Sequence, residues 1–195
     1  MYRDDLSNKL IHLTSDKEAQ SGEEIFYEIL DSGKLIGSSK TIRGGFKCIC
    51  FSEAPISKLG LLLSRENSIR TKYSPFGVMI DKKYMFSLGA RPVIYQPNNE
   101  FVQLNNDNQY RHVIFDPNNG IDWTWEREWR YKADELSLDP SVVTLIVPTR
   151  DIVENIKESH NSGNQLYATL GDAGQSGITS LPWHFIVLED LGVKM

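Results

Sequence analysis

Two glutamates and an arginine at alternate positions form the stretch with the clearest chemical potential. Residues 123–131 read WTWEREWRY, with Glu126, Glu128 and Arg130 at every second position. Strand periodicity predicts these three side chains on one face and the tryptophans on the other. The tryptophans would anchor the strand, and Arg130 could orient Glu128 through a charge-assisted hydrogen bond. A solvated ion pair on an edge strand would give the same sequence pattern, and such a pair contributes little to stability.

A histidine near the N-terminus is the second candidate. His12 lies in the run Ile11-His12-Leu13-Thr14, where alternation places His12 and Thr14 on one side of a short strand. Taken alone, this pattern is more typical of a hydrogen-bonded core histidine than of a catalytic one. The sequence contains no serine in a nucleophile elbow and no catalytic Cys–His spacing, so it does not indicate a covalent hydrolase.

The composition predicts one ordinary globular domain over residues 1–195. The chain is 40% hydrophobic and 24% charged, which suits one sizeable core. No apolar run approaches the roughly 18 residues of a membrane span, and the polar N-terminus does not resemble an export signal. Cys48 and Cys50 are two positions apart, which does not suit a disulfide and fits a reducing cytoplasm. No second ligand pair follows for zinc, so we expect no metal.

Positive charge is concentrated in one segment although the chain has a net charge of −5. Residues 32–83 hold ten basic and three acidic side chains, so this segment carries +7 and the remainder −12. Two interpretations are open. The segment is either a solvated face or a groove for a phosphorylated ligand or a nucleic-acid strand.

Short strands and a few helices must position these residues. Ser21 and Glu24 form a capping box that begins a helix over 21–30. Patterning predicts strands over 10–14, 46–51, 76–80, 92–95, 112–115, 128–131, 142–148 and 183–188, and further helices over 57–70 and 149–160. The absence of regular strand–helix alternation and of a Gly-rich phosphate loop disfavours Rossmann and P-loop domains. The predicted fold class is α+β.

Several segments resemble bacterial ADP-ribosyltransferases. His12-Leu13-Thr14, followed by a helix that ends in ILDSGKL (29–35), resembles the opening of DarT-like ADP-ribosyltransferases. The segments CFSEAP (50–55), RPVIY (91–95) and WEREWR (125–130) resemble the AbiGi-type abortive-infection proteins of phage defence. The resemblance implies an ADP-ribosyltransferase-like fold, a split antiparallel β-sandwich flanked by a few helices. It implies that NAD lies in the cleft between the two sheets.

The resemblance also implies roles for individual residues. Glu128 would be the catalytic carboxylate, and Glu126 would activate or orient the acceptor. The NAD contacts would come from His12, Thr14, Arg43, Phe51, Ser52 and Tyr95, with Arg65 or Arg70 as alternatives to Arg43. Arg130 and Lys47 would orient or contact the substrate.

The same resemblance implies the acceptor and the partners. Arginine-modifying transferases with a Glu-x-Glu pair open with an arginine where this chain has His12, so a nucleobase of RNA or DNA is favoured as acceptor. A toxin of this kind would act in toxin–antitoxin phage defence with an antitoxin protein as its partner, and the most specialised relatives of this type also use a chaperone.

Two other readings remain open. The first is a degenerate homologue that binds NAD, a nucleotide or a partner without transfer, as an immunity protein does. The second is an unrelated α+β enzyme or binding module, including a nuclease that holds Mg²⁺ with Asp122, Glu126 and Glu128. A nuclease of that kind needs a divalent metal, and a transferase does not.

Overall fold

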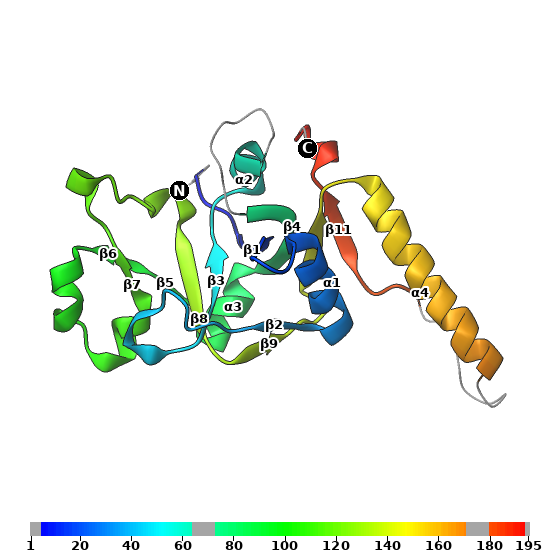
Figure 1. The fold of residues 1–195 in the computed structure, drawn as a ribbon, viewed down its shortest axis with the longest axis horizontal. Coiled ribbons are helices and arrows are strands. Elements are labelled where there is room, and N and C mark those ends of the chain that lie inside the picture. The colour runs from blue at the N-terminus through cyan, green and yellow to red at the C-terminus, as the bar shows by residue number, and fades with distance from the viewer. Residues whose placement is uncertain (1–4, 64–72, 171–179, 194–195) are drawn as a thin grey trace.

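The computed structural model describes residues 5–63, 73–170 and 180–193 (Figure 1). The strands are β1 (Lys9–Ser15), β2 (Lys34–Ile36), β3 (Cys48–Ser52), β4 (Tyr73–Asp81), β5 (Arg91–Pro92), β6 (Ile94–Gln96), β7 (His112–Ile114), β8 (Glu128–Lys132), β9 (Glu135–Ser137), β10 (Val143–Val147) and β11 (His184–Val187). The α-helices are α1 (Gly22–Ser32), α2 (Ile56–Leu63), α3 (Lys82–Leu88) and α4 (Arg150–Leu170). Short 3₁₀ turns are η1 (Arg43–Gly45), η2 (Asn98–Gln103), η3 (Asn106–Arg111), η4 (Pro117–Asn119), η5 (Thr124–Glu126) and η6 (Glu189–Leu191).

The main sheet has seven strands in the order β11-β10-β4-β1-β3-β8-β5. Its pairs are antiparallel except for β10 with β11. Two small sheets accompany it, β2 with β9 and β6 with β7. This mixture confirms the predicted α+β class. Within the described residues no helix has the length and apolar character needed to cross a membrane.

The main sheet consists of two halves that meet at a narrow junction. β1 is paired with β4 along most of its length, and β3 is paired with β8 from end to end. Between β1 and β3, by contrast, Ile11 and Ser52 form the single registered pair among the described residues. In place of the two antiparallel sheets that the resemblance implied, the structure has one sheet that divides between β1 and β3.

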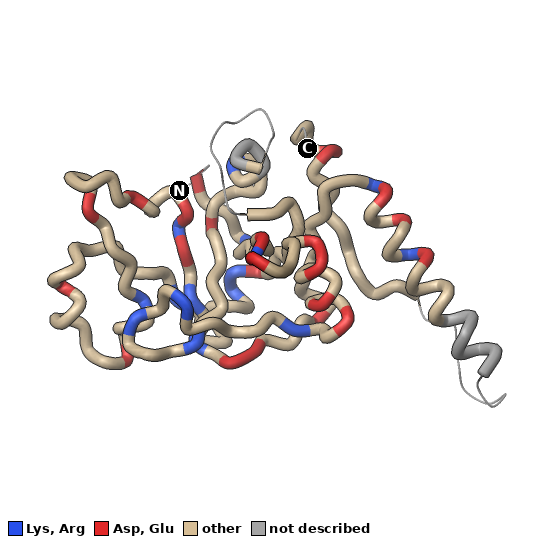
Figure 2. Tube along the Cα trace, in the orientation of Figure 1, with Lys and Arg blue, Asp and Glu red and all other residues tan. Residues whose placement is uncertain are grey.

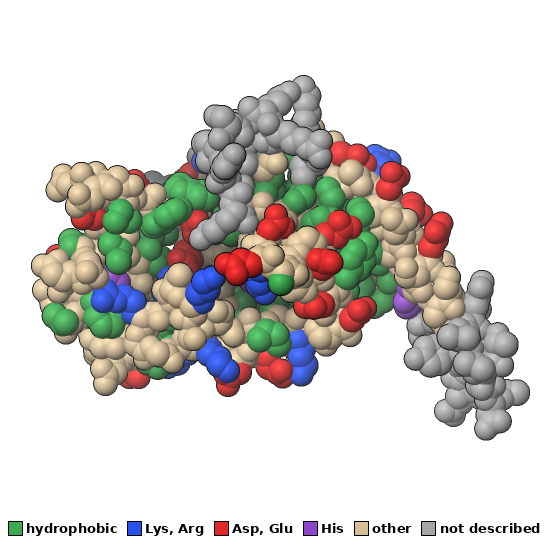
Figure 3. All heavy atoms as spheres, viewed as in Figure 1, with side chains coloured by type: hydrophobic (Ala, Val, Ile, Leu, Met, Phe, Trp, Pro, Cys, Tyr) green, Lys and Arg blue, Asp and Glu red, His purple; other side chains and the backbone are tan. Residues whose placement is uncertain are grey.

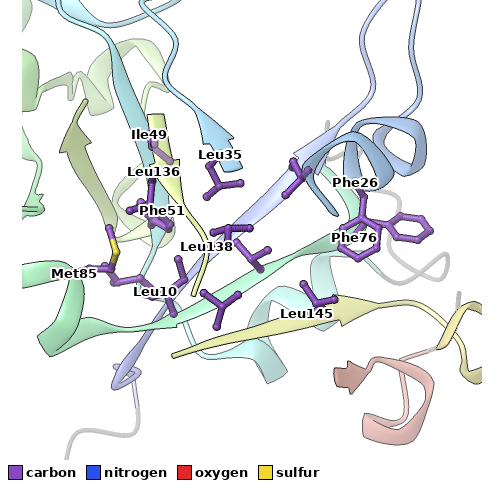
Figure 4. Close-up of a cluster of buried hydrophobic side chains, with 14 of the residues drawn as sticks. Leu10, Phe26, Leu35, Ile49, Phe51, Phe76, Met85, Leu136, Leu138 and Leu145 are labelled. Atoms are coloured by element: carbon purple, nitrogen blue, oxygen red, sulfur yellow. The ribbon is translucent and has the colours of Figure 1, made fainter. Parts of the chain in front are cut away.

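The larger hydrophobic core covers one face of this sheet (Figure 4). Alternate strand residues such as Leu10, Phe51 and Leu145 point into it. Phe26 of α1 packs against Phe76 of β4, with ring centroids 5.3 Å apart. Side chains of α1, α3, α4 and the β2–β9 sheet complete this core. Burial of large side chains of this kind is the main stabilising contribution to such a fold.

The opposite face of the sheet is covered by two separate groups. Leu59 of α2 packs over Ile11 and Ile146. Tyr110 of η3 packs with Ile42 and Cys48, next to β8. The small β6–β7 sheet and its flanking turns lie at this end of the molecule (Figure 1). The alternate residues of β3 and β8 that face this second side carry the candidate chemistry.

The predicted capping box begins α1 as expected. Ser21 Oγ accepts from the Glu24 backbone N–H at 3.2 Å, and the Ser21 backbone N–H donates to Glu24 Oε2 at 2.7 Å. Gly33 ends the helix in the left-handed region with φ 65°, which glycine adopts without strain. The Ser21→Ala variant should lower the free energy of unfolding by about 1 kcal/mol. Urea denaturation measures this, and Ser159→Ala at an exposed position of α4 should leave stability nearly unchanged.

The element boundaries depart from the sequence prediction in several places. The strand expected over 92–95 is two short strands, β5 and β6, which pair with different partners. The helix expected over 57–70 is described only to Leu63, and the rest lies outside the described residues. The helix expected over 149–160 continues to Leu170. Strands β2 and β9 and helix α3 were not predicted, because each is too short to show a periodic pattern.

Candidate active site

A buried ion pair holds Glu128 at the start of β8. Arg130 Nε donates to Glu128 Oε1 at 2.7 Å, and Arg130 Nη2 donates to Oε2 at 3.2 Å. The two side chains are only 5% and 13% exposed, so the pair is shielded from water. Arg130 Nη1 also donates to the carbonyls of Tyr110 and His112 at 2.5 and 3.2 Å. The contact between Arg130 and Glu128 that the alternate spacing predicted is present. Backbone carbonyls of η3 and β7 also hold the guanidinium in place.

Glu126 lies on a turn and not on the strand. Residues 124–126 form η5, and the strand begins only at Glu128. Trp129 is 9% exposed, whereas Trp123 and Trp125 are 44% and 39% exposed. The prediction that three tryptophans anchor one strand face was therefore wrong for the first two.

Local hydrogen bonding explains why the strand pattern fails here. Asp122 Oδ1 accepts from the backbone N–H and the hydroxyl of Thr124 at 2.8 and 2.6 Å, which favours a turn. Arg127 then takes the left-handed conformation with φ 45°, which ends the turn and redirects the chain into β8. Its side chain forms an ion pair with Asp5.

Two tyrosine hydroxyls support this segment, one at the Glu126 carboxylate and one at the backbone next to it. Tyr73 donates to Glu126 Oε1 at 3.0 Å. Burial raises the pKa of Tyr73, and the negative charges of Glu126 and Glu128 raise it further. Tyr95 donates to the Trp123 carbonyl at 3.1 Å and accepts from the Glu128 backbone N–H at 3.1 Å. Tyr73 therefore belongs to the site, although no spacing in the sequence pointed to it.

Strand β3 supplies the floor beneath the two glutamates. Ser52 is paired directly with Glu128, and its hydroxyl donates to the Glu126 carbonyl at 2.6 Å. The Cys50 thiol lies against Glu128: burial raises its pKa, and the carboxylate charge and a hydrogen bond to it raise it further. Ser52 thus fixes the turn that carries Glu126, whereas the resemblance implied a contact with NAD.

His12 lies at the junction of the two halves of the sheet. Its Nδ1 donates to the Cys50 carbonyl at 2.8 Å, and its ring meets the Phe51 ring edge-on with centroids 5.8 Å apart. A carbonyl can only accept, so the proton is on Nδ1 and Nε2 of the neutral ring is an acceptor. Burial lowers the pKa of His12, which favours this neutral form.

Thr14 and Phe51 belong to the interior. Each is 3% exposed. Thr14 Oγ1 donates to the Phe76 carbonyl at 3.1 Å, and a Cβ on Gly22 would come within 3.0 Å of that oxygen. Phe51 points into the larger core, on the face of β3 opposite to Cys50 and Ser52. Their placement does not support the NAD contacts that the resemblance implied.

Arg43 and Lys47 have partners other than Glu126 and Glu128. Arg43 donates to Asn98 Oδ1 at 2.6 Å and lies 4.0 Å from the centroid of Phe101. Lys47 pairs with Asp134 at 3.1 Å on the surface, beyond the end of β3 opposite to Ser52. Arg65 and Arg70 lie outside the described residues.

Three of the seven basic side chains in the described part of the basic segment pair with carboxylates. Besides Lys47, Lys34 pairs with Glu135 at 2.8 Å and Lys82 with Glu53 at 2.5 Å. Blue and red segments accordingly lie side by side along β2 and β9 (Figure 2). Acidic side chains gather over α1 and α4 on the face shown in Figure 3. This arrangement favours the solvated-face interpretation over a continuous basic groove.

The three carboxylates of the nuclease alternative do not form a metal site. The described residues contain no group of three or more His, Cys, Asp or Glu side chains placed to hold a metal ion. Asp122 instead caps the turn through Thr124. The structure therefore gives no support to Mg²⁺ held by Asp122, Glu126 and Glu128.

Two histidines, His12 and His112, make the free energy of unfolding depend on pH. His112 is 1% exposed, its Nε2 donates to the Pro97 carbonyl at 3.3 Å, and its Nδ1 has no partner within the described part of the chain. Burial lowers the pKa of His112, and the nearby charges of Arg43 and Arg130 lower it further.

We expect stability to fall as the pH drops from 7.5 to 5.5. Both histidines have a folded-state pKa below the unfolded value of about 6.5, so the unfolded chain takes up protons that the folded chain does not. Their contribution is complete above the unfolded pKa and is lost as the pH falls through the folded pKa. Urea denaturation across this range measures the slope. It should persist in His184→Asn, an exposed control, and a slope of zero or of opposite sign would refute the assignment.

Comparison with known proteins yields no relative for this chain. No protein-family model, curated protein or solved structure matches it. The functional argument therefore depends on the geometry of the carboxylates and on the chemistry that their partners permit.

Proposed function

We propose that the chain is an NAD-dependent ADP-ribosyltransferase that transfers ADP-ribose to a base of RNA or DNA. One observation carries the proposal. Glu126 and Glu128 are brought together beside the junction of the two sheet halves, and they are held by different partners. Arg130 holds Glu128, and Tyr73 holds Glu126. Two carboxylates in different environments suit two different chemical roles.

The chemistry explains why a rigid carboxylate is useful. The glycosidic bond between the ribose C1′ and nicotinamide breaks, and its electron pair leaves with nicotinamide. The ribose then resembles an oxocarbenium ion, which a fixed negative charge stabilises more than it stabilises the ground state. Glu128, hydrogen-bonded to the ribose 2′-hydroxyl, would supply that charge. A nitrogen of the base then bonds to C1′, and Glu126 accepts its proton.

The surroundings of the pair are compatible with this substrate. His12 shares its face of β1 with Leu10 and Thr14, on the side of the larger core and opposite to Glu128, so the proposal assigns it no contact with the ribose. The division of the sheet between β1 and β3 supports an ADP-ribosyltransferase-like fold with NAD at that division. The pyrophosphate has no assigned cation, because Arg43 is engaged with Asn98 and Phe101.

The biological setting follows from the sequence resemblance alone. We propose a cytoplasmic toxin of a toxin–antitoxin phage-defence system, with a protein antitoxin and a chaperone as partners. The acidic net charge of −5 implies that recognition of nucleic acid is local to the site.

The experiment follows NAD turnover by the purified chain in the presence of EDTA. NAD labelled in its adenosine half is incubated with RNA, DNA or a protein lysate, and released nicotinamide and transferred label are both measured. We expect label in one nucleic-acid fraction, with nicotinamide released in step. Turnover that requires added Mg²⁺, or cleavage of the nucleic acid without label, would favour the nuclease.

One observation favours a second candidate, a non-catalytic binding protein. Arg130 contacts both Glu128 oxygens, which is also how a structural ion pair is built. Such a protein would bind NAD or a nucleotide without releasing nicotinamide. Calorimetric binding of NAD with no turnover under any condition would establish this candidate and exclude the transferase.

A further inference from the structure

We propose that Tyr73 is a positioning residue that fixes Glu126 for the acceptor step. This inference rests on the proposed function and adds a division of labour within its site. Tyr73 begins β4, in the half of the sheet formed by β11, β10, β4 and β1. Glu126 lies on the turn that leads into β8, in the other half. The 3.0 Å hydrogen bond between them therefore spans the division of the sheet.

The backbone of Tyr73 is fixed by the sheet. It is registered with Ser15 of β1, just after a register shift between Leu13 and Ser15. A shift of this kind bends a strand and redirects a side chain, and such irregularities are enriched next to active sites. Burial and the adjacent carboxylates keep the phenol protonated, so its hydroxyl acts as a donor.

The backbone of Glu126 is fixed independently of Tyr73. Ser52 Oγ donates to the Glu126 carbonyl at 2.6 Å, and the Glu53 backbone N–H donates to the Arg127 carbonyl at 3.2 Å. Arg127, in its left-handed conformation, is paired with Asp5. The turn therefore has its own supports, and the Tyr73 hydroxyl controls the direction of the Glu126 carboxylate.

The partners of Glu128 are separate from this contact. Arg130 holds both carboxylate oxygens, and Tyr95 accepts from the Glu128 backbone N–H. Removing the Tyr73 hydroxyl should leave this arrangement intact. Nicotinamide would still be released. Because the base would no longer pass its proton to Glu126, water would attack the ribose C1′ in its place. The ratio of transfer to NAD hydrolysis therefore reports on Tyr73.

The test compares the wild type with Tyr73→Phe, Glu126→Gln and the double variant. For Tyr73→Phe we expect the KM for NAD and the rate of nicotinamide release to stay within about twofold. Transfer of labelled ADP-ribose to nucleic acid should fall about 10- to 100-fold, the scale of a displaced general base. The double variant should transfer no less than Glu126→Gln alone, because Tyr73 acts through Glu126.

The control is Tyr131→Phe, which removes a tyrosine hydroxyl from β8 on the face that packs against the larger core. It should change neither reaction, and the melting temperatures of all variants should be compared. Equal losses of release and transfer in Tyr73→Phe, or additive losses in the double variant, would show a structural role only. If the wild type releases no nicotinamide, the proposed function fails and this inference fails with it. If the wild type transfers and Tyr73→Phe transfers equally well, only the inference is overturned.

Discussion

The Glu128→Gln variant is expected to release nicotinamide from NAD about 10²- to 10³-fold more slowly than the wild type. Glutamine keeps the shape of the side chain and removes its negative charge. The charge matters most when the ribose becomes cationic, so the rate should fall while the KM for NAD changes little. Single-turnover release of nicotinamide, measured by chromatography with saturating NAD, separates the chemical step from binding.

The matched control is Glu135→Gln in β9, where the carboxylate is paired with Lys34 on the surface. It should release nicotinamide at the wild-type rate. Because Glu128→Gln leaves Arg130 without its carboxylate, folding of the variant must be confirmed at the assay temperature. A folded Glu128→Gln variant with the wild-type rate would remove Glu128 from the chemistry and leave the ion pair as a structural feature.

The fold was predictable where local chemistry and periodicity agree. The capping box at Ser21 and Glu24 identified α1, and Gly33 marked its end. The apolar run around Leu145 identified β10. Such elements are specified by residues within a few positions of each other, so the sequence alone contains the information.

The division of the sheet was not predictable in detail. It depends on which strands pair across distant parts of the chain, such as β1 with β4 and β3 with β8. Alternation told us that His12 and Thr14 share a face, but it could not tell us that this face is the interior. The same limit explains the error for Phe51, whose strand was predicted and whose orientation was not.

The candidate site was predictable only in part, for the same physical reason. The Glu128–Arg130 contact is local, and its spacing revealed it. Glu126 joins the pair through a turn stabilised by Asp122, which the strand pattern concealed. Tyr73 is 53 residues away from its partner in the sequence, so only the folded chain brings the hydroxyl and the carboxylate together.

The Arg130→Met variant is expected to lower the free energy of unfolding by about 3–5 kcal/mol, the loss typical of removing one member of a buried ion pair. Methionine fills part of the space but offers no donors. Glu128 is then left as a shielded charge, and the carbonyls of Tyr110 and His112 lose the hydrogen bonds that attach η3 and β7 to β8. Urea denaturation of wild type and variant at pH 7.5 measures the difference.

Two further variants separate the ion pair from a simple loss of packing. Adding Glu128→Gln to Arg130→Met should recover part of the lost stability, because it removes the uncompensated charge. Arg150→Met breaks a surface pair with Asp190, whose side chains are 73% and 41% exposed, and should leave the unfolding transition unchanged within error. If Arg130→Met lowered the free energy of unfolding as little as Arg150→Met does, Glu128 would not need Arg130 to stay in place. The rigid carboxylate that the proposed chemistry requires would then have to be held by the Cys50 thiol, which hydrogen-bonds to it.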